Sequence, residues 1–354
     1  MAYTTVDDPQ ANFQVELYTG NGSADHAMTF DGGTDMQPDV VWFATRSNAA
    51  NHQMHNALTA ETYHYVRPNA TNALITSNSD ALTSFNSDGF TIGSDGVINE
   101  NTYTYVAWCW KAGGSFSAQT DGTIDTSRSV NTTAGFSIAT YTGNATNGAT
   151  RGHGLGVVPH MIMVKNRTDA VKWYVYHHKN TAAPETDYLA LDSDGATTDQ
   201  AGWNDTAPTS TLVTTSDGSE VNASGKAYVM YSWTGIQGFS KFGSYEGNGN
   251  ADGPFVYTGF RPAMVILKKT SGTGGWYMYD IKRPGRNNEN GYLQANSASA
   301  EDTNSGNFGF DILSNGFKLR GTYTTINESG GTFVYMAWAD QPFVNSEGEP
   351  ANAR

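Results

Sequence analysis

The chain has 354 residues, of which 15% are charged and 12% are aromatic, compared with about 25% charged in an average globular protein. Its 34 acidic and 20 basic residues leave a net charge of −14, which disfavours nucleic acid or an anionic membrane as a partner because both would repel the chain. No apolar run approaches the roughly 18 residues of a membrane span, and the first residues lack the features of a secretory signal.

Three similar segments follow one another along the chain, and this repetition is the main organising feature of the sequence. Each segment opens with an aromatic residue and a Tyr-Thr-Gly-Asn-like turn, continues with a proline and an apolar run, and closes with asparagine and a tryptophan strand. The openings are Phe13–Gly22, Phe136–Asn144 and Phe239–Gly249. The prolines are Pro38, Pro159 and Pro262, and the closing residues are Asn99 with Trp110, Asn222 with Trp233, and Asn327 with Trp338.

These landmarks divide the chain into domains of about 100 residues, an ordinary domain size. Residues 115–134 are rich in Ser, Thr, Asp and Gly and are poor in apolar residues, which predicts a linker. The predicted parts are an N-terminal arm (1–12), a first segment (13–114), the linker (115–134), a second segment (135–238), a third segment (239–343) and a C-terminal tail (344–354). We expect separate folded beads with interfaces, and an arm that becomes ordered only on docking.

Within each segment the sequence predicts strands and turns rather than helices. Asp88-Gly89 and Asn315-Gly316 lie between short apolar runs, which is a strong hairpin signal. Seven or eight such runs per segment predict an all-β fold of three tandem antiparallel β-sandwich (jelly-roll-like) repeats. One helix candidate is 49–60, but the corresponding residues of the other segments have the pattern of a strand.

The closing strand of each segment is predicted to lie in the middle of a sheet. In Tyr228–Trp233 both alternating faces are largely apolar or aromatic, so we expect this strand to be covered on both sides. Cys109 lies in the equivalent strand of the first segment and is predicted to be a buried, unreactive thiol. The recurring asparagines, including Asn222, are predicted turn residues with a positive φ or a local side-chain hydrogen bond.

Enzymatic motifs are absent from the sequence. It contains no Gly-x-Ser-x-Gly elbow and no phosphate-binding loop. His153 lies in Gly-His-Gly-Leu-Gly and is predicted to be a loop residue rather than a catalytic base. No pair of carboxylates stands out as a glycosidase would require. We therefore predict no catalytic residues, no cofactor and no enzymatic activity.

Two sets of residues resemble fragments of metal sites. His52 and His55 in the first segment, and the pair 177–178 in the second, lack the further ligands of a zinc site, and we predict that they pack as aromatic-like groups on a strand. Residues 192–195 resemble the start of a calcium loop, but Trp203 occupies the position of the bidentate glutamate, so a turn is expected. A looser calcium site of oxygen ligands remains an alternative, and the prediction for metals is none.

Exposed aromatic rings could bind a sugar by stacking on its apolar face. Trp173 and Trp276 occupy equivalent strand positions, which predicts that both pack in the core. Trp203 has no counterpart in the other segments, and we predict it as a surface residue that binds ligand.

Three stretches of the chain resemble a known family. They are 103–114 (Tyr-Thr-Tyr-Val-Ala-Trp-Cys-Trp-Lys-Ala-Gly-Gly), 152–167 (beginning Gly-His-Gly-Leu-Gly-Val-Val-Pro) and 239–255 (Phe-Ser-Lys-Phe-Gly-Ser-Tyr-Glu onwards). They are similar to a repeated β-sandwich-like domain of unknown function found in virion structural proteins of tailed phages, mainly marine ones. The resemblance spans residues 13 to 343, and it implies no catalytic residues.

The resemblance and the residues together give a leading functional hypothesis, one main alternative and a third hypothesis, a polysaccharide depolymerase, which would require an acidic cleft. The leading hypothesis is a non-enzymatic structural protein on the surface of a tailed-phage virion, as a tail or head fibre, another appendage or a capsid decoration, assembled in the host cytoplasm. Its expected partners are other capsid or tail proteins, with a homo-oligomer as an open possibility. The alternative is a carbohydrate-binding module that recognises a glycan on the host surface through Trp203.

Overall fold

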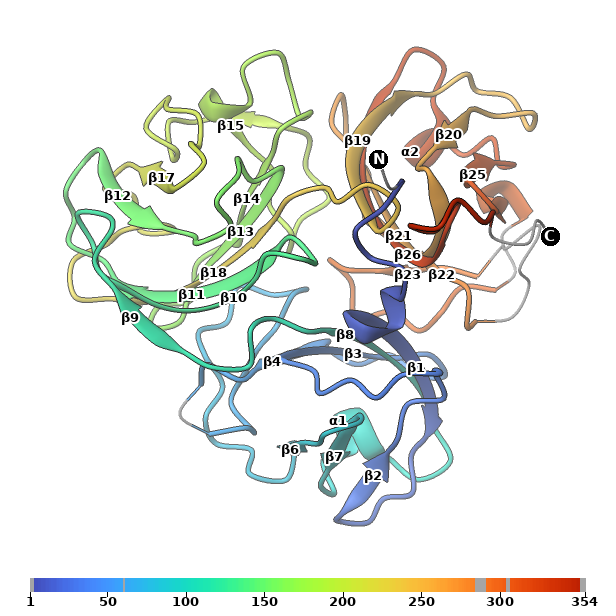
Figure 1. Ribbon diagram of the computed structural model, residues 1–354, viewed down its shortest axis with the longest axis horizontal. Helices are drawn as coiled ribbons and strands as arrows, with labels where there is room; N and C mark the ends of the chain where they lie inside the picture. The colour runs from blue at the N-terminus through green and yellow to red at the C-terminus, as the bar shows by residue number, and fades with distance from the viewer. Residues whose placement is uncertain (1–2, 60, 284–290, 304–305, 351–354) are drawn as a thin grey trace.

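A computed structural model describes residues 3–59, 61–283, 291–303 and 306–350 (Figure 1). The last residue of the 49–60 helix candidate, the first two residues of the arm and the last four of the tail lie outside this described part. The chain is all-β, as its composition predicts, and its strands form several antiparallel sheets.

Three larger sheets, one in each segment, share a strand order in which the closing strand lies between the first strand and the strand that follows the proline. In the first segment the order is β1 (Phe13–Thr19), β8 (Thr104–Trp110), β3 (Val40–Thr45), β4 (Gln53–Asn56) and β5 (Tyr65–Val66). In the second it is β14 (Tyr174–His177), β13 (Met161–Asn166), β18 (Ala227–Trp233), β11 (Phe136–Thr142), β10 (Thr126–Asn131) and β9 (Ser117–Gln119). In the third it is β19 (Ser240–Glu246), β26 (Thr332–Pro342), β21 (Phe260–Lys269), β22 (Trp276–Asp280) and β23 (Leu293–Gln294).

Smaller sheets and short helices complete the segments. The small sheets are β2 (His26–Met28), β7 (Phe90–Ile92) and β6 (Leu82–Phe85); β12 (Ala149–Gly152) and β17 (Leu212–Thr215); β15 (Asp187–Tyr188) and β16 (Thr198–Asp199); and β20 (Phe255–Tyr257), β25 (Gly316–Leu319) and β24 (Phe310–Leu313). The helices are α1 (Gly96–Asn99), α2 (Thr324–Asn327) and the 3-10 turns η1 (Pro9–Ala11), η2 (Pro184–Thr186) and η3 (Gly306–Phe308). The 49–60 helix candidate is wrong, and the strand pattern of the corresponding residues in the other segments is the better guide, because this stretch contains strand β4.

The closing strand is central and covered on both faces, as predicted. In β18 the side chains of Val229, Tyr231 and Trp233 belong to one apolar cluster, whereas Tyr228 and Met230 belong to another. The second cluster lies within the second segment, but the first also contains residues of the first and third segments. One face of each large sheet therefore contributes to a core that all three segments share.

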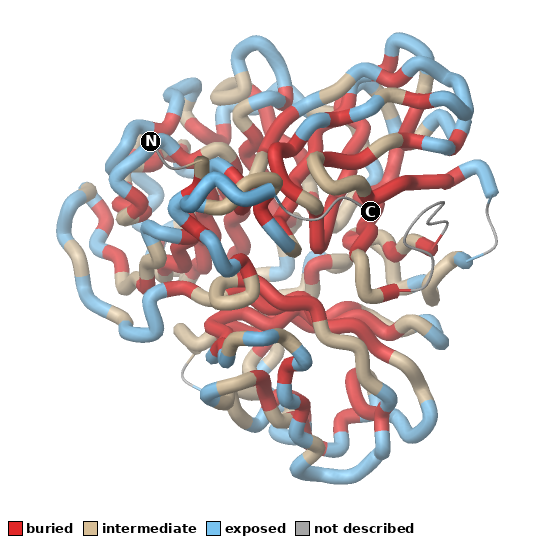
Figure 2. The backbone as a smooth tube through the Cα atoms, turned by 45° about the vertical axis from the view of Figure 1, so that its right-hand side comes forward, coloured by how far each residue is buried: buried red, intermediate tan, exposed pale blue. Residues whose placement is uncertain are grey.

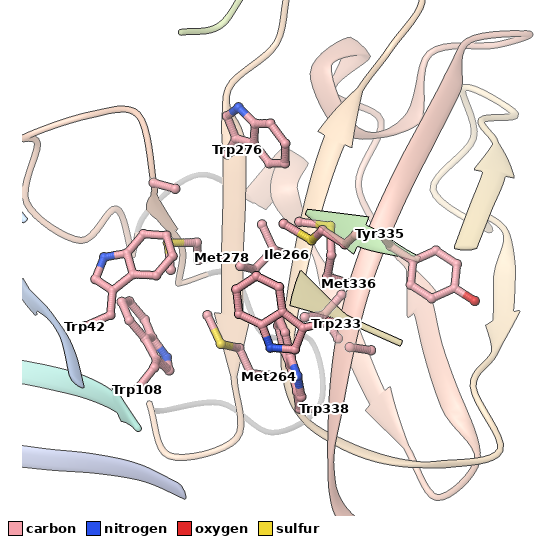
Figure 3. Close-up of a cluster of buried hydrophobic side chains, with 14 of the residues drawn as sticks. Trp42, Trp108, Trp233, Met264, Ile266, Trp276, Met278, Tyr335, Met336 and Trp338 are labelled. Atoms are coloured by element: carbon pink, nitrogen blue, oxygen red, sulfur yellow. The ribbon is translucent and has the colours of Figure 1, made fainter. Parts of the chain in front are cut away.

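Three tryptophans meet at the centre of this shared core. The ring centroids of Trp110, Trp233 and Trp338 are 6.5, 5.3 and 6.2 Å apart for the pairs 110–233, 110–338 and 233–338. Met264 and Met336 pack in the same cluster near Trp233 and Trp338 (Figure 3). Figure 2 shows buried backbone in red where the three lobes meet and exposed loops at the periphery. The expectation of separate beads is wrong, because one continuous apolar cluster contains residues of all three segments.

Equivalent hydrogen bonds join the three segments into a closed ring. At each boundary, a backbone N–H of one segment donates to a backbone carbonyl of the next segment. The accepting residue directly follows strand β13, β21 or β3 of that segment. The three bonds are Leu74 to Arg167 (3.0 Å), Thr197 to Thr270 (3.1 Å) and Glu301 to Arg46 (2.9 Å). The last bond returns from the third segment to the first, so the three lobes of Figure 1 surround one centre.

Buried cations reinforce each boundary. Lys165 Nζ donates to Thr71 O (2.8 Å), and Lys268 Nζ donates to Gly195 O (2.7 Å). Burial lowers the pKa of both lysines to about 8. The boundary between the third and first segments instead carries an ion pair between Arg46 and Glu301 (2.7 Å). Each of these contacts needs both of its segments in place.

The predicted linker is part of the large sheet of the second segment, because it forms strand β10 and, outside it, the edge strand β9. Strand β10 pairs with β11, with Ser127 opposite Thr140 and Asn131 opposite Phe136. The polar composition of β9 and β10 suits the outer strands of a sheet, because backbone hydrogen bonds rather than apolar side chains attach these strands to it.

The described part of the N-terminal arm is packed on the same chain rather than waiting for a partner. Val6 is 4% exposed and Thr4 is 2% exposed. Tyr3 OH donates to Gly259 O at 2.9 Å, and Ser346 N–H donates to Asp7 Oδ1 at 2.6 Å. The arm therefore lies against the third segment and the C-terminal tail, and the expectation of an arm ordered only by docking is wrong for residues 3–12.

The recurring asparagines are buried connectors rather than turn residues with positive φ. Asn222 is 0% exposed, and its Oδ1 accepts from Asn144 N–H (3.0 Å) while its Nδ2 donates to Thr146 O (3.0 Å). Asn99 and Asn327 make corresponding bonds to the opening turns of their own segments. None of the three has a positive φ. Each asparagine thus ties the closing helical turn of its segment to the opening turn.

Candidate functional site

A hollow with a partly apolar lining lies between the second and third segments, and we call it the β19 groove. Its volume is about 790 Å³. It is lined by Tyr3, His160, 178–179, Gly235, Gln237, 240–245, 255–259 and Tyr335. One wall is thus the edge strand β19, another is β20 of the small sheet, and the second segment contributes the two histidines.

The third segment has a small residue in its first strand at the position where the other two segments have phenylalanine. Phe13 pairs with Trp110 and Phe136 pairs with Trp233, but Ser240 pairs with Trp338. The sequence analysis aligned Phe239 with the two phenylalanines, and the strand register shifts this alignment by one residue.

Two exposed aromatic side chains stand on strand β20. Phe255 is 47% exposed and Tyr257 is 46% exposed, while Val256 between them is buried. The alternation of a strand directs Phe255 and Tyr257 to the same face. Large apolar side chains gathered on one exposed face are a usual mark of an interaction site.

Neighbouring polar groups fix the ring of Tyr257. Lys241 Nζ donates to Tyr257 O at 2.7 Å and lies 5.3 Å from the centre of the ring, within range of a cation–π contact. The hydroxyls of Tyr3 and Tyr257 are 3.0 Å apart. Burial lowers the pKa of the Lys241 ammonium and raises that of the Tyr3 hydroxyl. The arm and β19 therefore hold this ring in one orientation.

A stacked histidine pair forms the opposite wall. The rings of His160 and His178 are 4.1 Å apart and nearly parallel, with an angle of 12°. His178 Nε2 contacts Phe242 O at 2.9 Å, and Gly235 N–H donates to His160 Nδ1 at 3.0 Å. Burial, followed by the neighbouring His178 and Lys179, lowers the pKa of His160 to about 4. Burial also lowers the pKa of His178, so both rings are neutral near pH 7.

The predicted ligand residue Trp203 does not lie in this groove, and its prediction as a surface residue is wrong. Its side chain is 0% exposed. It packs on Tyr174 at 5.2 Å and on Tyr176 at 5.8 Å between ring centroids, inside the second segment. The third segment has a similar buried cluster, in which Phe308 packs on Tyr277 with 5.2 Å between ring centroids, so an aromatic residue that looks unique in the sequence need not be exposed.

The other histidines named from the sequence lie apart from the groove. His52 is buried directly before strand β4 of the first segment, and Trp42 Nε1 donates to its Nδ1 at 3.0 Å. Burial lowers the pKa of His52 and His55 to about 3. His153 is buried, and its Nε2 contacts Thr209 O at 3.2 Å. The prediction of packed, aromatic-like histidines at 52 and 55 is confirmed.

The calcium-like stretch is occupied by contacts within the protein. Asp192 Oδ1 accepts from Trp173 N–H at 3.0 Å, and Gly195 O accepts from Lys268 Nζ at 2.7 Å. Across the described residues no three His, Cys, Asp or Glu side chains gather as a metal site would need. Cys109 is buried and unpaired, as predicted, and burial raises the pKa of its thiol well above the ordinary value.

These features define the class of the protein: it is an all-β chain whose antiparallel sheets share one core, with an apolar groove at a free sheet edge. No helix among the described residues is long and apolar enough to cross a membrane. The chain belongs to the family described as domain of unknown function (DUF7483), whose model matches residues 8–342. No curated protein and no solved structure matches the chain.

The β19 groove is not among the sites predicted from the sequence, although the sequence contains two signals of it. The distance from the opening phenylalanine to the tyrosine of the opening turn is one residue longer in the third segment (Phe239 to Tyr245) than in the first (Phe13 to Tyr18). The run 255–257, Phe-Val-Tyr, also places two aromatic residues on one face of a strand. Neither signal identifies the histidine wall, which comes from another segment.

Proposed function

We propose that the protein is a non-enzymatic structural protein on the surface of a tailed-phage virion, built from three tandem β-sandwich repeats. The virion context comes from the resemblance of 103–114, 152–167 and 239–255 to such proteins. The observation that supports a structural role is the closed ring of equivalent boundary bonds around Trp110, Trp233 and Trp338. A ring of this kind resists relative movement of its parts, which a surface building block requires.

The acidic surface and the buried ionisable groups are consistent with this proposal. A net charge of −14 keeps the protein soluble and discourages contact with genome and membrane. The lysines at the boundaries, Lys165 and Lys268, are committed to backbone carbonyls. The β19 groove has no Asp or Glu in its lining, so it lacks the carboxylate pair of most glycosidases.

The test is to locate the protein in purified phage particles. Antibody labelling under the electron microscope, together with quantitative mass spectrometry, would give its position and the number of copies per particle. We expect a fixed copy number on the outer surface. Its absence from washed particles, or the release of reducing ends from host polysaccharide by the purified protein, would contradict the proposal.

Carbohydrate binding is a second candidate function, now supported by the exposed rings of Phe255 and Tyr257 instead of Trp203. A ring held in place can stack on the apolar face of a pyranose, and Lys241 and His178 can hydrogen-bond its hydroxyls. A glycan array probed with the wild type and with Tyr257→Ala tests this function. Binding by the wild type that the variant loses would support it, and an array without any signal would count against it.

A further inference from the structure

The outer edge of strand β19 is partly free in the described structure, from Phe242 N–H through Ser244. Ala339 N–H donates to Phe239 O at 2.7 Å, so the backbone N–H and C=O groups of Phe239 and of every second residue after it face β26. The backbone groups of the intervening residues 240, 242 and 244 face away from β26. Both backbone groups of Ser240 are bonded to Ile236, because Ser240 N–H donates to Ile236 O (2.9 Å) and Ile236 N–H donates to Ser240 O (3.1 Å). Phe242 O contacts His178. No strand pairs with the edge from Phe242 to Glu246.

The same edge in the second segment already holds a strand. There the chain places β10 beside β11, with Asn131 opposite Phe136, Ser129 opposite Ile138 and Ser127 opposite Thr140. Counted from the paired tryptophans, these three β11 residues correspond to Ser240, Phe242 and Ser244 of β19. The edge thus has the geometry to receive an antiparallel strand.

Residues before β10 also cover the small sheet of the second segment. Ile124 N–H donates to Thr150 O of β12 at 2.9 Å, so residues 121–131 span from the small sheet to the large one. In the third segment the corresponding small-sheet strand is β20, which carries the exposed Phe255 and Tyr257. The β19 groove is therefore the position that residues 121–131 fill in the second segment, and it is open in the third.

The charge of the groove differs from that of the whole molecule. Its lining includes Lys179 and Lys241 but no Asp or Glu, in a chain of net charge −14. Electrostatic complementarity therefore favours a neutral or acidic ligand. A second copy of this chain is favoured less than a partner that presents one extended strand, because the ring already buries the boundary surfaces that copies would share.

We propose that the β19 groove binds an extended, neutral-to-acidic polypeptide strand of a partner protein, which pairs antiparallel with β19 and packs alternate apolar side chains on Phe255 and Tyr257. Main-chain hydrogen bonds to the edge at Ser244 give affinity, and the two rings select side chains on one face of the ligand. This binding does not depend on the virion context, so the two proposals can fail separately.

The experiment uses the full chain and a fluorescent eight-residue peptide of alternating Val and Thr with Glu at both ends, titrated to about 1 mM and followed by fluorescence anisotropy. A second peptide carries N-methyl groups on alternate residues, which blocks hydrogen bonding along one edge. A third has Lys in place of Glu. We expect saturable binding of the first peptide, and at least tenfold weaker binding of the methylated peptide and severalfold weaker binding of the Lys peptide.

Variants then locate the site. Tyr257→Ala should weaken binding severalfold, as should Ser244→Pro, which removes an outward N–H without touching the bonds to β26. Tyr323→Ala, which removes an exposed ring outside the groove, should bind like the wild type. Absence of saturable binding, equal binding of the methylated peptide, or equal losses in Tyr257→Ala and Tyr323→Ala would overturn the proposal. So would a glycan that binds at Tyr257 in a protein that binds no peptide. Because the methylated peptide needs no mutation, the test holds even where Ser244→Pro fails to fold.

Discussion

At the scale of single residues, buried side chains that reach distant backbone groups organise each segment. Asn222 contacts the opening turn of its segment, far away in the sequence. The recurrence of the asparagine was visible in the sequence, but its partners were not, because no local pattern encodes a bond to a distant turn. The prediction of Trp203 as a surface residue is wrong because Tyr174 and Tyr176 enclose its ring. The apparent absence of a counterpart in the other segments carries no information about burial.

Replacing the buried asparagine should destabilise the protein. Asn222→Ala leaves Asn144 N–H and Thr146 O without their partner, and each unsatisfied buried group costs about 1–3 kcal/mol. We expect the free energy of unfolding in urea to fall by roughly 2–4 kcal/mol. Asn147→Ala, at an exposed position in the same turn region, is the control and should change it by less than about 0.5 kcal/mol. Equal effects of the two variants would contradict the connector role.

His52 should make stability depend on pH below neutrality. Burial lowers its pKa in the folded protein from 6.5 to about 3, so the unfolded chain binds the extra proton first and stability is lost as the pH falls below about 6.5. One such group costs about 1.4 kcal/mol per pH unit. Between pH 7 and pH 5 the wild type should therefore lose about 2 kcal/mol more than His52→Gln, measured by urea unfolding. Identical pH profiles would show that His52 does not titrate as described.

At the scale of elements, strand pairing decides what composition cannot. Residues 115–134 have the polar composition of a linker, yet β10 pairs with β11 along its length. Burial in β10 follows no clean alternation, because Thr126 and Ser129 are buried while their neighbours are half-exposed. The closing strands, such as Tyr228–Trp233, were predicted correctly because their apolar character on both faces is a property of the residues themselves.

Breaking the β10 pairing should release this edge without unfolding the molecule. Ser129→Pro removes the N–H opposite Ile138. We expect faster cleavage by a protease within 115–131, at least severalfold, with the rest of the chain intact on a gel. Ser115→Pro, in an exposed bend outside both strands, is the control and should be cleaved like the wild type. Unchanged cleavage of Ser129→Pro would indicate that β10 is held by its side chains instead.

At the scale of the whole molecule, one apolar cluster contains residues of all three segments, so we expect them to unfold as one cooperative unit. The sequence predicted three similar parts but not their arrangement: the residues that join them, such as Leu74 and Arg167, bond through backbone atoms that carry no sequence signal. The central role of Trp110 and Trp233 was equally hidden, since each looks like an ordinary core residue of its own sheet.

Removing one central tryptophan should therefore destabilise all three segments together. Trp233→Ala deletes a ring that contacts both Trp110 and Trp338, and such a truncation costs about 3–5 kcal/mol. Hydrogen exchange followed by mass spectrometry should show faster exchange in the large sheets of all three segments. Tyr323→Ala removes an exposed ring and should leave exchange unchanged. Faster exchange confined to 135–238 would instead support independent beads.

The bond from Glu301 back to Arg46 has a consequence for assembly. Each segment uses one side of its joint for the segment before it and the other side for the segment after it, and the third is joined to the first. A head-to-tail contact that failed to close would add further copies without limit and produce a filament. Here the contact between the third and first segments closes the ring, so no segment is left with an unused boundary of this kind. Any larger array must therefore form through different surfaces.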